Sequence, residues 1–157
     1  KKMAGYWRLL YTDFKPDAPS NGKLGPFIGK VYQYLDPSNA QIKNILDIHF
    51  LGNTLRILGA LVAKQEISKP NEWRITFDYI TNSITLFAAL KVLTIRKEFL
   101  SDIGQQEIRK WEITYLDDDF RVMRAKNDKD SGNDKEAFIF ILEREQEADL
   151  DFDAVEL

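Results

Sequence analysis

The sequence predicts a mainly β fold: a closed antiparallel up-and-down β-barrel of about eight strands with few short helices. Large apolar residues alternate with polar ones in segments along the whole chain, as at residues 6–14 (YWRLLYTDF). Breaker-rich turns such as residues 36–39 (DPSN) separate these segments. No segment carries a convincing long helical pattern. A β-sandwich would give a similar pattern, and periodicity alone does not separate the two folds.

Each predicted strand follows from this alternation and from the turns that bound it. Residues 55–67 and 73–80 are expected to form a hairpin through Lys69-Pro70-Asn71. Residues 84–99 are ambiguous, because leucines at helical spacing compete with β-branched residues; we expect a strand with a short helical turn beside it. In chain order, the predicted strands cover residues 6–14, 27–35, 41–50, 55–67, 73–80, 84–99, 107–116, 120–126 and 137–144.

The length of 157 residues suits one domain with a substantial core. We expect the barrel domain to cover residues 1–145 and an acidic C-terminal tail to cover residues 146–157. The polar segment at residues 127–135 (NDKDSGNDK) is expected to be a mobile hairpin loop.

Composition excludes several classes of function. The net charge of −3 argues against a nucleic-acid partner, because phosphate binding needs a basic surface. Without cysteine there is no disulfide, thiolate nucleophile or thiolate metal site. No apolar run approaches the roughly 20 residues of a membrane-spanning helix.

The polar residues give little support for an enzyme. His49 is the only histidine, so a catalytic triad has one possible base and a histidine-rich zinc site is excluded. The three carboxylates of residues 117–119 alternate sides in a strand and do not converge on one ion. We expect a tight turn there, with one carboxylate paired with Arg121 or Arg124. The sequence thus predicts no catalytic residues, no metal and no cofactor.

The aromatic residues are the main indication of function. They exceed what one small core needs, and rings that do not fit inward leave a cavity or an exposed patch. Gln33 and Asn44, on adjacent predicted strands, could add polar groups to such a cavity, or could face solvent. The candidate cavity residues are Tyr11, Tyr32, Gln33, Tyr34, Asn44, Phe50, Trp73, Phe77, Tyr115, Phe138 and Phe140.

Several motifs together resemble the plastid lipid-associated proteins, or fibrillins of plastoglobules. They are GYWRLLYT at residues 5–12, GKVYQ at 29–33 followed by Asn44, YLDDDFRVMR at 115–124 and FILER at 140–144. The long motif at 115–124 is fairly specific, whereas lipocalins at large share the Gly-x-Trp. The polar loop at 127–135 departs from the tight glycine turn that family members often have there.

The resemblance implies a lipocalin-like barrel in the plastid, peripheral to thylakoids or plastoglobules. In such barrels the tryptophan of the first strand closes the narrow end, and an arginine of the last strand lies across its ring. This role falls to Gly5 and Trp7 with Arg144 as the first candidate and Arg124 as the second. The implied ligand is an isoprenoid quinone, a carotenoid or a fatty acyl lipid.

Three functions compete. The leading hypothesis is non-catalytic binding, transport or storage of a hydrophobic molecule in the barrel, with docking on a lipid surface through apolar residues of the rim. The second is a structural coat or scaffold at a lipid droplet that acts through its outer surface. The third is an isoprenoid-modifying enzyme with an Asp, a Tyr or His49 as acid or base. Fold analogy does not decide among them.

Overall fold

The computed structural model describes residues 3–52, 54–87, 89–98, 108–127 and 137–146. The predicted loop at 127–135, apart from Asn127, and the predicted tail, apart from Gln146, lie outside this part of the chain. The elements are β1 Gly5–Thr12, the 3-10 helix η1 Pro19–Asn21, β2 Lys23–Leu24, β3 Phe27–Ile28, β4 Lys30–Asp36, β5 Gln41–Phe50, β6 Leu55–Lys69, β7 Glu72–Leu86, β8 Leu90–Glu98, β9 Ile108–Leu116, β10 Phe120–Asn127 and β11 Phe138–Glu145.

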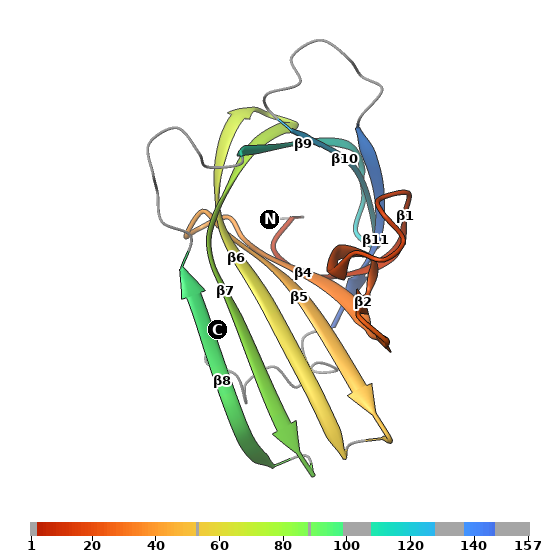
Figure 1. Ribbon diagram of the computed structural model, residues 1–157. Helices are drawn as coiled ribbons and strands as arrows, with labels where there is room; N and C mark the ends of the chain where they lie inside the picture. The colour runs from red at the N-terminus through yellow and green to blue at the C-terminus, as the bar shows by residue number, and fades with distance from the viewer. Residues whose placement is uncertain (1–2, 53, 88, 99–107, 128–136, 147–157) are drawn as a thin grey trace.

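Nine of the strands form one antiparallel sheet in the order β6-β5-β4-β1-β11-β10-β9-β7-β8 (Figure 1). An additional pairing between β6 and β7 joins the sheet to itself, so the strands surround a common interior. The predicted β class and the barrel-like arrangement are thereby confirmed. The remaining strands, β2 and β3, form a small separate hairpin.

The ring is complete at one end and open at the other because β7 changes its partner. Its first residues, Glu72 to Thr76, pair with β9, and Tyr79 to Leu86 pair with β8. Strand β6 pairs with β7 along the whole length of both. Figure 1 shows the result: a closed ring from which β5 to β8 extend as an open sheet.

Two predicted strand boundaries differ from the structure. The expected strand at residues 27–35 is divided into β3 and β4 at Gly29, where the backbone crosses so close to β5 that a Cβ would lie 2.6 Å from Ile48 Cγ1. The ambiguous residues 84–99 contribute the end of β7 and all of β8, and the turn between them contains Phe87. The expected helical turn is not found among the described residues of this segment; β-branched residues prevail because both strands extend an existing sheet.

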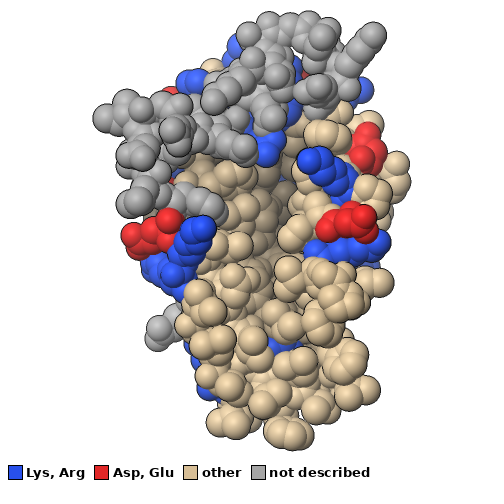
Figure 2. Space-filling view, viewed as in Figure 1, with Lys and Arg blue, Asp and Glu red and all other residues tan. Residues whose placement is uncertain are grey.

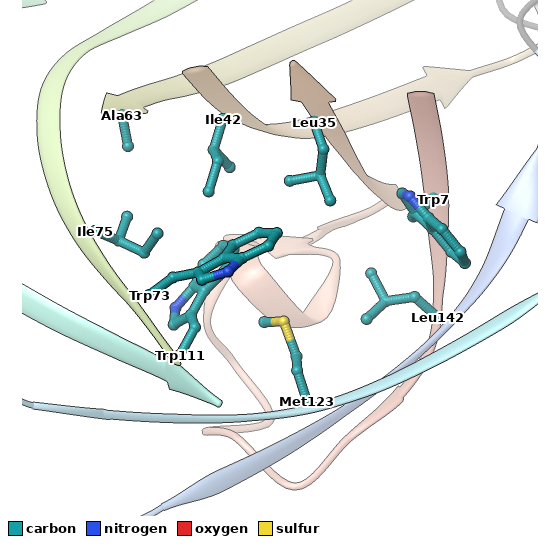
Figure 3. Close-up of a cluster of buried hydrophobic side chains, with 9 residues drawn as sticks. All are labelled: Trp7, Leu35, Ile42, Ala63, Trp73, Ile75, Trp111, Met123 and Leu142. Atoms are coloured by element: carbon teal, nitrogen blue, oxygen red, sulfur yellow. The ribbon is translucent and has the colours of Figure 1, made fainter. Parts of the chain in front are cut away.

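The closed end is filled by a cluster of nine buried side chains, here called the floor cluster and shown in Figure 3. Because successive side chains of a strand point to opposite sides, the strands of the closed ring contribute alternate residues to the interior, whereas β8 is exposed along its length. The floor cluster consists of Trp7, Leu35, Ile42, Ala63, Trp73, Ile75, Trp111, Met123 and Leu142. It blocks one end of the ring.

Candidate functional site

A cavity of about 440 Å³ lies next to the floor cluster, on the side of the open end. The inward-facing residues of β5 run from the closed end to the open end. Ile42 belongs to the floor cluster, Asn44 and Leu46 line the cavity, and Phe50 ends the strand beyond the cavity. On β6 the same order runs from Ala63 through Gly59 and Ile57 to Leu55. The interior is therefore a pocket with a blind end and a mouth.

The cavity wall is largely apolar, with a few polar side chains. Gln33 and Asn44 face each other across the β4–β5 ladder and both line the cavity. Asn82 and Arg109 add an amide and a guanidinium from β7 and β9. Gly59 makes room for the amide, because a Cβ there would lie 3.0 Å from Asn82 Oδ1. Such a wall suits a lipophilic molecule that carries a few oxygen atoms.

One cation, Arg121, is completely buried at the blind end. Its Nη2 donates a hydrogen bond to Gln33 Oε1, and its guanidinium carbon lies 5.0 Å from the centre of the Trp7 ring. Its Nε and Nη1 have no hydrogen-bond partner among the described residues. Burial, and secondarily repulsion by Arg144, lowers the pKa of Arg121 to about 9. At neutral pH the side chain still carries its charge.

Trp7, Gly5 and Arg144 form a compact contact beside this cation. The guanidinium carbon of Arg144 lies 4.2 Å from the centre of the Trp7 ring, while its Nη1 donates to Ala4 O at 2.9 Å and its Nε to Asp118 O at 2.5 Å. Gly5 has a φ of +106°, which favours glycine, and a Cβ at this position would lie 3.6 Å from Arg144 Nη1. The second arginine at the ring is Arg121, and not the predicted Arg124, which is exposed on the opposite side of β10.

The structure places five of the eleven candidate residues on the cavity wall: Gln33, Asn44, Phe77, Phe138 and Phe140. The other six lie elsewhere. Trp73 is in the floor cluster, Tyr32 and Tyr34 belong to an apolar cluster on the outer side of the sheet, and Phe50, Tyr11 and Tyr115 are about half exposed.

Strand geometry explains these six positions. Residues 32, 33 and 34 cannot all face inward, because consecutive side chains of a strand alternate. A β-bulge between Leu9 and Tyr11 turns Tyr11 outward although Trp7 and Leu9 face inward. A second bulge opposite Val122 does the same for Tyr115, whose hydroxyl donates to Asp117 Oδ2 at 2.6 Å.

The predicted turn at residues 117–119 is present and is built by one carboxylate. Asp117 Oδ1 accepts hydrogen bonds from the backbone N–H groups of Asp119 and Phe120 at 2.8 and 2.6 Å. Of the two arginines expected to pair with a carboxylate of this turn, Arg121 points into the ring and bonds to Gln33, and Arg124 is exposed. Within the described residues, no group of three acidic or histidine side chains is placed to hold a metal ion. His49 lies against Asp47 at 3.1 Å and is not part of the cavity wall.

The open end carries an apolar rim, defined here as Phe50, Leu51 and Phe87. Leu51 and Phe87 are 73% and 72% exposed, and Phe50 is 46% exposed. The turn between β5 and β6 lies beside the turn between β7 and β8, since Phe87 N donates to Thr54 O at 2.9 Å. Figure 2 shows few charged side chains at this lower end. Leu51 and Phe87 also have left-handed backbone conformations, with φ of 49° and 50°.

Comparisons with known proteins show the family of the chain. The family model PAP_fibrillin, which describes the plastid lipid-associated proteins, matches residues 1–131. Searches of curated proteins and of solved structures each gave no significant match. In the described part of the chain, no helix combines the length and the apolar character that crossing a membrane requires. With a family match over most of its length and a ring of antiparallel strands around an apolar cavity, the chain belongs to the fibrillin family of plastid lipid-associated proteins.

Proposed function

We propose that the protein binds a hydrophobic molecule, such as an isoprenoid quinone, a carotenoid or another lipid, and carries or stores it without chemical change. The observation that carries the proposal is the apolar cavity of about 440 Å³, which is blind at the floor cluster. Burying about 300 Å² of apolar ligand surface gains roughly 7 kcal/mol. Immobilisation of the ligand offsets part of this gain, so the apolar contribution of the cavity alone corresponds to a Kd weaker than about 10 μM.

Tryptophan fluorescence tests this binding directly. Trp111 lines the cavity, and Trp73 and Trp7 lie in the floor beneath it, so a bound short-chain quinone should quench their emission saturably. Gly59→Leu places a side chain into the cavity and should abolish the quenching. The matched control Glu66→Leu adds a leucine at an exposed position of the same strand and should leave the quenching intact. Absence of saturable quenching in the wild type would refute the proposal.

The rim supports docking on a lipid surface at the mouth of the cavity. Two large apolar side chains stand in water at the tips of neighbouring turns, and each occupies a backbone conformation that costs a non-glycine residue roughly 1–2 kcal/mol. In a turn that only faces water, asparagine would be favoured at such positions, because it is polar and tolerates the left-handed backbone conformation. An apolar surface that accepts these tips, such as a lipid monolayer, offsets the exposure of the side chains.

Flotation with triolein droplets coated with phosphatidylcholine tests the docking. The double variant Leu51→Asn/Phe87→Asn should float less than the wild type without losing stability, since asparagine tolerates φ near +50°. Ile67→Asn, which removes an exposed apolar side chain at the other end of β6, should float normally. Equal flotation of the rim variant and the wild type would contradict docking through the rim. Flotation through the rim without quinone quenching would favour the structural coat protein instead.

A further inference from the structure

Arg121 holds a charge that no group of the described chain neutralises. It is 0% exposed, and its one hydrogen-bond partner among the described residues is the neutral amide of Gln33. Arg144, whose guanidinium lies against the same Trp7 ring, has the same sign. Buried charges are ordinarily paired with an opposite charge or saturated with hydrogen bonds, because desolvation is costly. Here two N–H bearing atoms, Nε and Nη1, have no acceptor within the part of the chain that the structure describes.

Gln33 connects this cation to the cavity. Its side chain lines the cavity wall, and its Oε1 accepts from Arg121 Nη2. With the carbonyl occupied, the two N–H bonds of the Gln33 amide are left as donors for an occupant of the cavity. Leu142, which pairs with Arg121 across the β10–β11 ladder, also lines the cavity. Arg121 is therefore one side chain away from the blind end of the cavity.

Building on the proposed lipid binding, we propose that the ligand is amphipathic and acidic: a long-chain carboxylic acid whose carboxylate lies at Gln33 and Arg121. One carboxylate supplies one negative charge, which matches the one guanidinium, and its oxygens accept hydrogen bonds from the Gln33 amide, while Arg121 lies directly behind Gln33 and supplies the opposite charge. The hydrocarbon chain then lies along the apolar wall toward the rim. A phosphate carries more charge than this site neutralises.

The choice between an acid and its ester distinguishes this inference from simple apolar binding. A methyl ester is more hydrophobic than the ionised acid, so a merely apolar cavity prefers the ester. A site with an unpaired cation prefers the acid. Parinaric acid, a fluorescent polyunsaturated fatty acid, and its methyl ester are suitable probes, because their emission rises when they enter an apolar site.

We expect wild-type protein at neutral pH to bind parinaric acid at least about tenfold more tightly than the ester. Arg121→Met should lower the affinity for the acid by about tenfold or more and change that for the ester by less than about twofold. Arg121→Lys, which keeps the charge, should retain part of the preference. The control Arg124→Met removes an exposed arginine of the same strand and should behave like the wild type.

Two results would overturn the inference. The first is equal or weaker binding of the acid in the wild type, which requires no variant to fold and leaves cavity binding itself intact. The second is a preference for the acid that survives in folded Arg121→Met, which would place the carboxylate elsewhere. Failure of the wild type to bind either probe or the quinone would instead refute the proposed function.

Discussion

Replacing Arg121 by methionine should make the ligand-free protein more stable, although most substitutions of fully buried residues destabilise. Methionine has a similar length, no charge and a flexible chain that fills irregular space. The arginine is completely buried beside Trp7 and has no acidic partner among the described residues. The substitution removes a desolvated charge and keeps most of the packing.

The magnitude follows from opposing contributions. Burial and the repulsion by Arg144 lower the pKa of Arg121 by several units, to about 9. At about 1.4 kcal/mol per pKa unit, holding the charged form in the folded protein costs roughly 5 kcal/mol. Methionine forfeits the hydrogen bond to Gln33, worth about 2 kcal/mol, and the contact with the Trp7 ring, worth about 1 kcal/mol. The net gain is about 2 kcal/mol, or roughly 4–8 °C in Tm.

The pH dependence gives this prediction a second test. The folded-state pKa of Arg121 is depressed, so the cost is present in full below pH 9 and disappears as the pH rises from about 9 toward the pKa of an arginine in the unfolded chain. The stability difference between Arg121→Met and the wild type should therefore be the same at about pH 6 and about pH 8. Urea denaturation followed by tryptophan fluorescence measures it, with Arg124→Met as the exposed control. If the free energy of unfolding of Arg121→Met is lower than that of the wild type by about 1 kcal/mol or more, the unpaired-charge reasoning is refuted.

Three further changes are expected to destabilise the fold, each measured by urea denaturation. Gly29→Ala sets a Cβ against the β5 backbone and should cost about 2 kcal/mol or more, whereas Gly59→Ala meets only a side-chain end and should cost less. Arg144→Met loses two hydrogen bonds to backbone carbonyls and weakens the contact with Trp7, for about 2–3 kcal/mol. Asp117→Ala removes both acceptor contacts of its turn and should cost about 1–2 kcal/mol.

The ring of strands could be predicted from the sequence because it rests on local signals. Alternation places residues such as Ile42, Asn44 and Leu46 on one side of β5, and the turn at residues 36–39 sets where β4 must reverse. The division of β7 between two partners has no such signal. It depends on where β8 and β9 meet the same edge, which is a long-range property of the sheet.

The cavity wall could be predicted only in part, because a β-bulge inserts one extra residue into a strand and so reverses which side of the sheet the following side chains face. The bulge between Leu9 and Tyr11 is invisible in the alternation of the sequence, and it moves Tyr11 from the interior to the surface. Arg121 was missed as an interior residue for a different reason. Both sides of β10 contain an apolar residue and an arginine, Met123 with Arg121 and Val122 with Arg124, so periodicity alone does not tell which arginine is buried.

The two ends of the cavity have opposite chemistry, and this polarity constrains how a lipid would enter. In a monolayer the acidic headgroup faces water and the chain points into the lipid, so a protein docked through its rim meets the headgroup first. An acid that enters headgroup-first ends with its carboxylate at Arg121 and its chain toward Phe50 and Phe87, in the orientation it had in the monolayer. No inversion is needed, and the chain stays in apolar surroundings throughout. The unpaired cation at the floor and the strained apolar turns at the rim therefore suit a single path of transfer.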